Sequence, residues 1–126
     1  MTPLHVTLIQ SNLHWENIPA NLAMFSQKIA AIKEATDVIV LPEMFSTGFS
    51  MRAAELAEPM DGSAVQWMQK TAAEKNCVIT GSLIIEEAGD YFNRLVWMRP
   101  DGTFDTYDKR HLFSLGGEEK TYTAGT

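Results

Sequence analysis

The chain has 126 residues, of which 45% are apolar and 21% charged, and its formal net charge at pH 7 is -6. This length and composition predict one folded domain over residues 1–126. Because a net negative charge repels phosphate backbones and anionic lipid, we expect no nucleic-acid partner and no membrane partner.

The cysteine and histidine content bears on the compartment and on bound groups. Cys77 is the only cysteine, which excludes a disulfide within the chain and suits a reducing compartment. No apolar run approaches the ~18 residues of a membrane span, so we expect a cytoplasmic protein. Since His5, His14 and His111 have no cysteine or carboxylate at ligand spacing, we predict no metal and no cofactor.

The first part of the chain has the pattern of a strand, a helix and a strand. Residues 4–10 are rich in Val, Ile and Leu and predict a buried first strand. Asn17 suits a helix cap and Pro19 a first helical turn, and apolar spacings of three and four continue this helix to about residue 35. Residues 38–41 are wholly apolar and predict a strand covered on both faces, which completes a βαβ unit.

An irregular segment, residues 44–62, precedes a second predicted helix. Ser63 and Gln66 are spaced as a capping box, in which each side chain satisfies a backbone N–H of the first turn. Asn76 suits the left-handed turn that commonly ends a helix. We therefore expect a second helix from Ser63 to about Asn76.

The remaining elements form an antiparallel meander. Residues 77–85 and 91–99 predict two strands joined around Gly89, and a turn at residues 99–102 leads to a third strand at residues 103–107. Together with the βαβ unit, this order predicts an α/β fold in which two main helices cover a mixed sheet.

Two ionisable side chains stand where predicted strands end, namely Glu43 and Lys109. Ligand sites of open α/β sheets form at strand ends, so we expect the two charged groups to share one pocket. A carboxylate there can act as a general base, and an ammonium group can stabilise an oxyanion. Glu118 or Glu119 remains as a carboxylate partner for Lys109. The competing interpretation is a surface glutamate and a solvated charged loop.

Cys77 is a candidate third member of this site, because a thiol could act as the nucleophile. It starts an apolar strand, however, at the opposite end from Glu43 if the strands run parallel. We therefore interpret Cys77 as a core residue.

Six segments together resemble the nitrilase superfamily of carbon-nitrogen hydrolases, and within it the omega-amidase type. They are residues 6–10, 21–22, 41–49, 80–82, 91–94 and 107–113. The fold that this resemblance implies is an α-β-β-α sandwich of two sheets with helices outside. Residues 1–126 would form an incomplete, N-terminal half of that domain.

The resemblance also implies roles for individual residues. Glu43 would be the general base, Lys109 would stabilise the tetrahedral oxyanion, and Glu118 would help to position the site. In the family reaction a cysteine thiolate attacks an amide or nitrile carbon, ammonia leaves, and the thioester is hydrolysed to the acid. The implied substrate is a small omega-amide. Independently of the resemblance, Met44, Phe45 and Phe49 predict an apolar wall near the site.

The chain departs from the family pattern in length. Family chains are about twice as long, and their nucleophilic cysteine follows the region matched by residues 124–125, a position that Cys77 does not match. We therefore expect a truncated chain that is inactive alone and that pairs with another chain, with a homodimer as the common family state.

Two alternative functions remain for the chain. One is a non-catalytic interaction module, and the other is a small-acid-binding α/β domain in which residues 45–49 form a lid.

Overall fold

The computed structural model describes residues 2–126 and has one five-stranded mixed sheet in the order β1-β2-β3-β4-β5. The strands are β1 (Val6–Leu8), β2 (Val38–Val40), β3 (Val78–Glu87), β4 (Asp90–Met98) and β5 (Phe104–Asp108). The first three run parallel, and the last three are antiparallel neighbours. This arrangement confirms the predicted α/β fold with its βαβ unit and meander.

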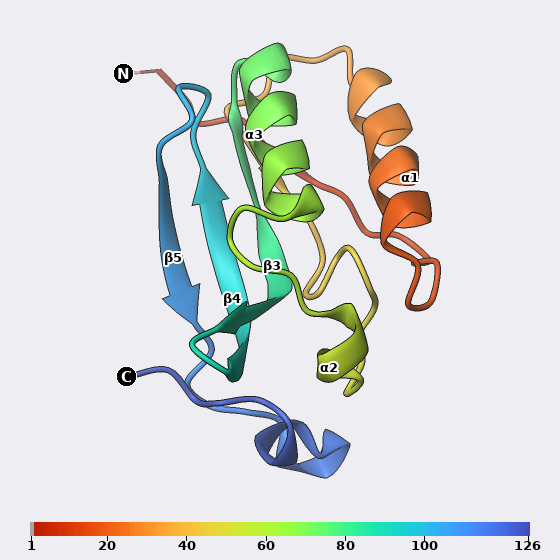
Figure 1. Cartoon of the computed structure of the whole chain (residues 1–126). Helices are drawn as coiled ribbons and strands as arrows, with labels where there is room; N and C mark the ends of the chain where they lie inside the picture. The colour runs from red at the N-terminus through yellow and green to blue at the C-terminus, as the bar shows by residue number, and fades with distance from the viewer. Residues whose placement is uncertain (1) are drawn as a thin grey trace.

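The two main helices, α1 (Ile18–Ala30) and α3 (Ser63–Lys75), cover the same face of the sheet (Figure 1). A short helix, α2 (Ala53–Leu56), lies at the lower end of the sheet together with the C-terminal segment. That segment holds two 3₁₀ turns, Ser114–Gly116 and Glu118–Lys120. None of the helices in residues 2–126 is long and apolar enough to span a membrane.

Helix α1 begins as predicted but ends earlier. The side chain of Asn17 accepts a hydrogen bond of 3.1 Å from the backbone N–H of Ala20, which confirms the cap. The helix ends at Ala30, and the chain then leads to β2, which pairs with β1. Just before these two strands, the backbone N–H of His5 donates to the carboxylate of Asp37 at 2.8 Å. The predicted end near residue 35 is therefore wrong, because the chain leaves the helix in time to enter β2 at Val38.

The predicted capping box at the start of α3 is wrong. Ser63 lies inside the helix and donates its hydroxyl to Glu58 at 2.5 Å, and the same carboxylate accepts the backbone N–H of Ala64 at 3.0 Å. A carboxylate from outside the helix therefore caps this N-terminus, where the helix dipole also favours negative charge. At the other end, Asn76 has φ 53° and ψ 50°, which confirms the left-handed cap.

The face of the sheet opposite the helices, the helix-free face, carries several exposed apolar side chains. Alternation along the strands and the strand register place Val6, Leu8, Leu95, Trp97 and Tyr107 on this face. Leu8 is 74% exposed and Val6 49%, so the prediction of a buried first strand is wrong. β1 is the edge strand, and α1 and α3 protect only the other face.

The main core lies between the two helices and the sheet. It contains Phe25 of α1, Met68 of α3, Ile79 of β3 and Val96 of β4, all fully buried. Gly81 of β3 leaves room for this packing, because a Cβ atom there would come within 2.8 Å of the ring of Phe45.

Candidate active site

Glu43 and Lys109 meet at one end of the sheet. β5 is antiparallel to β4, β4 is antiparallel to β3, and β3 is parallel to β2, so β2 and β5 point in the same direction. Glu43 follows the end of β2 and Lys109 follows the end of β5. The ammonium nitrogen Nζ of Lys109 lies 2.7 Å from Oε2 of Glu43, as the argument from strand ends predicts.

Glu43 precedes a strained turn. Met44 adopts φ 48°, a left-handed conformation that costs a residue with a Cβ atom about 1–2 kcal/mol. Ser82 of β3 holds the turn: its hydroxyl accepts the backbone N–H of Met44 at 2.8 Å, and its carbonyl accepts that of Phe45 at 3.2 Å. Such backbone strain persists only where the surroundings enforce it, and it is concentrated at functional sites. The turn thereby fixes the backbone beside the carboxylate.

Asn93 of β4 lies between the carboxylates of Glu43 and Glu118. Its side-chain amide donates to Oε2 of Glu43 at 2.7 Å and to Oε2 of Glu118 at 3.0 Å. Its backbone carbonyl accepts the N–H of Lys109 at 2.9 Å. No role for Asn93 was predicted from the sequence, although an asparagine inside a strand is itself a signal because strands are depleted in asparagine.

Glu118 is fully buried, accepts two hydrogen bonds and forms one ion pair. Besides the bond from Asn93, its Oε1 atom accepts the backbone N–H of Phe113 at 2.7 Å and lies 3.0 Å from Nζ of Lys109. Burial raises the pKa of Glu118, but the hydrogen bonds from Phe113, Asn93 and Lys109 outweigh it and hold the pKa below its usual range. Of the two candidate partners for Lys109, the structure brings in Glu118 and leaves Glu119 exposed.

Lys109 is held in its charged form. Burial lowers the pKa of its ammonium group, but the hydrogen bonds and negative charges of Glu43 and Glu118 raise that pKa above its ordinary value. The ammonium group also lies 5.4 Å from the ring centre of Phe49, within range of a cation–π contact. Lys109 is therefore a donor of hydrogen bonds and positive charge rather than a base at neutral pH.

Glu43 differs from Glu118 in the freedom of its second oxygen. Both hydrogen bonds to Glu43, from Lys109 and Asn93, reach Oε2. Within residues 2–126 no hydrogen bond reaches Oε1, and the side chain is 46% exposed. Among the described residues, Oε1 of Glu43 is thus the one carboxylate oxygen of the cluster without a hydrogen bond or ion pair, on a side chain that is partly exposed, and it can accept a proton from a bound molecule.

Glu43 and Lys109 line two neighbouring hollows. The first, of about 280 Å³, opens on the helix-free face beside Thr80, Leu95 and Tyr107. The second, of about 650 Å³, lies among the loops; besides Glu43 and Lys109 it is lined by Phe49, His111, Leu112, Phe113, Ser114 and Leu115. A small molecule in either hollow would lie beside both charged groups.

The structure corrects the predicted place of Phe45. Its side chain is fully buried in the main core, with ring centres 5.8 Å from Phe25 and 5.7 Å from Trp67, so it offers no surface to a substrate. The turn after Glu43 directs this ring over Gly81 and into the helix-covered core. Met44 is also fully buried and lines neither hollow, so its predicted place in the apolar wall is wrong, whereas Phe49 does line the second hollow. Because residues 44–48 are buried, this segment also does not fit the proposed lid.

Cys77 lies in the main core, as predicted. It is 3% exposed and precedes β3, at the end of that strand opposite Glu86 and Glu87. Burial raises the pKa of its thiol, which keeps the thiol protonated at neutral pH. Cys77 therefore has neither the position nor the ionisation of a nucleophile for this site.

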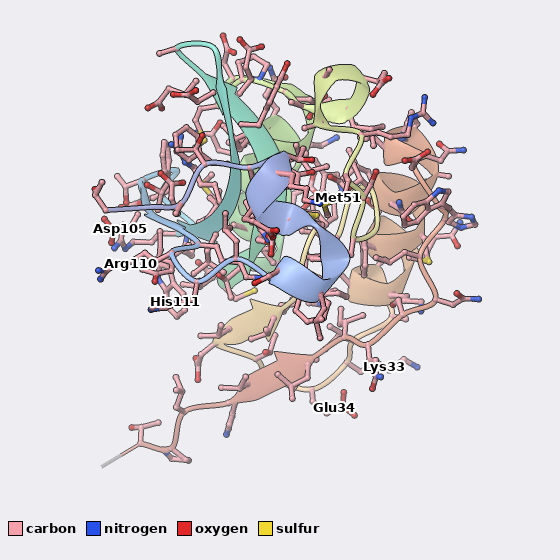
Figure 2. All side chains as sticks on the ribbon, turned by 90° about the horizontal axis from the view of Figure 1, so that it is seen from below. Lys33, Glu34, Met51, Asp105, Arg110 and His111 are labelled. Carbon is pink, nitrogen blue, oxygen red and sulfur yellow. The ribbon has the colours of Figure 1, made fainter. Side chains whose placement is uncertain are left out.

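Arg110 and His111 follow Lys109 in the chain but form none of the hydrogen bonds and ion pairs of the charged cluster. Figure 2 places Arg110 and His111 at the outer margin of the molecule, on the side away from α1. His111 lines the second hollow, whereas Arg110 forms no ion pair within residues 2–126. Over the same residues, no group of three or more His, Cys, Asp or Glu side chains is placed to hold a metal ion.

Sequence comparison relates almost the whole chain to known hydrolases. A family model described as carbon-nitrogen hydrolase matches residues 5–126. The omega-amidase YafV of Yersinia enterocolitica is 42% identical over 125 residues, which is 99% of this chain and 48% of that protein. The 2-oxoglutaramate amidase of Bacillus subtilis is 27% identical over 96% of this chain and 48% of its own length. The chain thus spans about half the length of these relatives.

Structural comparison gives the same result for the fold. XC1258 from Xanthomonas campestris, described as a CN-hydrolase superfamily protein, has a TM-score of 0.95 and 38% identity over 100% of this chain and 48% of its own. An amidase from Nesterenkonia has a TM-score of 0.86 at 18% identity, which is a likeness of fold alone. Residues 2–126 therefore have the fold of the corresponding half of these larger proteins.

Proposed function

Because this chain belongs to the carbon-nitrogen hydrolase family, we propose that it supplies the acid–base part of an amidase that hydrolyses a small omega-amide to a carboxylic acid and ammonia. The observation that carries the proposal is the contact of 2.7 Å between Lys109 and Glu43, one carboxylate oxygen of which remains open. The 42% identity to an omega-amidase supports the substrate class.

In the proposed reaction Glu43 is the general base. Its Oε1 atom takes the proton of a cysteine thiol, and the thiolate attacks the amide carbon while the carbonyl electron pair moves onto oxygen. The ammonium group of Lys109 stabilises that oxyanion. When the oxyanion collapses, the C–N bond breaks and the nitrogen leaves as ammonia with the proton from Glu43. Water then gives a proton to Glu43 while its oxygen attacks the thioester carbon. The C–S bond breaks, Glu43 returns the proton to the thiolate, and the acid is released.

Glu118 has a supporting role in this proposal. It accepts hydrogen bonds from Phe113 and Asn93, pairs with Lys109 and is fully buried, so it is unsuited to exchange protons with a substrate. Its charge instead keeps Lys109 protonated and directs the ammonium group toward Glu43. The two carboxylates thus differ in task because they differ in environment.

The thiol must come from outside residues 1–126 in this proposal. Cys77 is the only cysteine in the chain and lies in the helix-covered core. The omega-amidase of Yersinia enterocolitica is about twice as long as the matched region, which leaves room for a nucleophile in a second half. By itself, the 126-residue chain is accordingly expected to release no ammonia from an amide.

The test uses the product of the complete reading frame that contains residues 1–126. Wild-type protein should release ammonia from 2-oxoglutaramate, the compound named in one relative. Glu43→Gln and Lys109→Ala should each lower kcat by about 10²–10⁴-fold. Glu119→Gln, which changes an exposed neighbour of Glu118, is the control and should leave kcat unchanged. Ammonia release retained in both site variants, or a reading frame with no further cysteine, would contradict the proposal.

A second candidate function is supported by the helix-free face. Its exposed apolar side chains, Leu8, Leu95, Trp97 and Tyr107, form a surface suited to packing against another chain or a second copy. The chain would then act as a cytoplasmic interaction module and form a homodimer. Light scattering on the 126-residue chain should give a dimer or larger species; a soluble monomer at high concentration would contradict this alternative.

A further inference from the structure

We propose that Asn93 is a positioning residue that holds the carboxylates of Glu43 and Glu118 at a fixed separation and thereby directs Oε1 of Glu43 toward the reacting group. This inference rests on the proposed function, since it concerns the geometry of the proposed base. It extends that proposal, because the orientation of the Glu43 carboxylate is assigned to a neutral side chain of β4.

The hydrogen bonds of the Asn93 amide carry the argument. A planar NH₂ group has two N–H bonds that diverge at a fixed angle. In this structure the group donates to one oxygen of each carboxylate, at 2.7 Å to Glu43 and at 3.0 Å to Glu118. Asn93 is 2% exposed, so water does not compete for these donors. The geometry of this small group therefore constrains the separation of the two carboxylates, in addition to the Lys109 ammonium group that contacts both.

The charge balance of the cluster shows why a neutral donor is needed. Glu43, Glu118 and Lys109 together carry two negative charges and one positive charge, and the ammonium group contacts both carboxylates. A second cation would compete with Lys109 for Glu43, while a residue without donors would leave two carboxylates repelling each other. An amide provides two donors without adding charge.

The backbone of Asn93 is rigid enough for this task. Its carbonyl accepts the backbone N–H of Lys109 at 2.9 Å, so one residue binds both carboxylates through its side chain and the backbone of Lys109 through its own backbone. The next residue, Arg94, binds Asp108 of β5 through two hydrogen bonds of 2.6 Å and 3.0 Å. β4 and β5 are thus locked together beside the site, and movement of Asn93 is restricted.

Three substitutions separate positioning from packing. Asn93→Asp keeps the size of the side chain but removes the donors and adds a third negative charge. Asn93→Ala removes the donors without adding charge, and Asn93→Ser keeps one donor. Asn12→Asp is the matched control, because it makes the same chemical change at an exposed residue.

The kinetic test uses the product of the complete reading frame. Asn93→Asp and Asn93→Ala should lower kcat by about 10- to 100-fold with KM changed less than about 2-fold, because a misplaced base loses rate more than binding. The acid limb of the pH–rate profile should move to higher pH, since loss of donors destabilises the ionised carboxylates. Asn93→Ser should lie between Asn93→Ala and the wild type. The inference would be overturned if all three variants kept the wild-type kcat and the wild-type acid limb of the pH–rate profile. It would also be overturned if kcat fell while the acid limb stayed in place.

A second measurement keeps the inference testable if the proposed function fails. In the 126-residue chain, the pH titration of the Glu43 and Glu118 carboxyl carbons can be followed by NMR without any substrate. The pKa of Glu118 should rise in Asn93→Ala and Asn93→Ser and stay unchanged in the control. An inactive wild-type enzyme with these titration shifts would reject the amidase proposal but support the holding role of Asn93. Unchanged titrations would reject that role.

Discussion

The helix-covered face of the sheet and the charged end of the sheet are built in different ways. On the helix-covered face, apolar side chains recur at helical and strand spacings, and Phe25, Met68 and Ile79 pack into one buried cluster. At the charged end, four polar residues come from four segments and are held by specific hydrogen bonds. Local periodicity is sufficient for the core, whereas the site depends on strand direction and on a strained turn.

The largest expected effect is in the helix-covered core. Phe45→Ala should lower the free energy of unfolding by about 3–5 kcal/mol, because it removes a fully buried ring. Phe104→Ala, at a position 43% exposed, should cost less than half as much. Urea unfolding followed by fluorescence measures both variants. If Phe45→Ala cost no more than Phe104→Ala, Phe45 would belong with the surface and not with the core.

Removing the cation should be the largest effect at the charged end. Lys109→Met should lower the free energy of unfolding by about 2 kcal/mol, since Glu118 loses a charged partner while remaining buried. Lys70→Met, at an exposed position of α3, should change it by about 0.5 kcal/mol or less. Equal effects in the two variants would show that the charged cluster contributes nothing particular to the fold.

The same cluster should give stability a defined pH dependence. The pKa of Glu118 is depressed in the folded protein, so its contribution is present above the ordinary value of 4.5 and is lost as pH falls through the lower, folded-state pKa. The pKa of Lys109 is raised, so its contribution is present below 10.5 and is lost as pH rises through the higher, folded-state pKa. Denaturant unfolding measured across this pH range should show that the free energy of unfolding falls less on acidification in Glu118→Gln than in the wild type. An equal fall in the two proteins would contradict the role assigned to Glu118.

The smallest expected effect lies in the hairpin between β3 and β4. Ala88 has φ 53° and precedes Gly89 with φ 84°, a pair of left-handed residues for which Asn-Gly is the preferred sequence. Ala88→Asn should therefore raise the free energy of unfolding by about 0.5 kcal/mol. The same change at exposed Ala73 in α3 should lower it by a similar amount, because asparagine disfavours helix interiors. Thermal unfolding should show melting temperatures that move in opposite directions.

Much of the fold follows from local sequence patterns. Asn17 is a confirmed cap because its side chain accepts a backbone N–H of the first turn, and Asn76 is one because asparagine tolerates the left-handed conformation that ends the helix. The exposure of β1 was not predictable from its apolar run, since which strand lies at an edge depends on the order of the whole sheet. The cap from Glu58 was missed because it comes from outside the helix.

The charged end was predictable only in part. Glu43 and Lys109 stand out because each follows a β-type run, and their meeting follows from the parallel directions of β2 and β5. The link through Asn93 requires the strand register, which the sequence pattern leaves open. Phe45 was misplaced because the left-handed conformation of Met44 redirects the chain, and nothing in the local sequence requires that turn.

The coupling between Lys109 and Glu118 tests most directly whether the charged end is one connected cluster. A double-mutant cycle with Lys109→Met and Glu118→Gln, measured by urea unfolding of the 126-residue chain, should give a coupling free energy of about 1–3 kcal/mol. The matched cycle with Glu119→Gln should give about zero, because Glu119 is exposed and outside the cluster. Equal coupling in the two cycles would contradict the arrangement in which buried Glu118, Asn93 and Lys109 together hold Glu43.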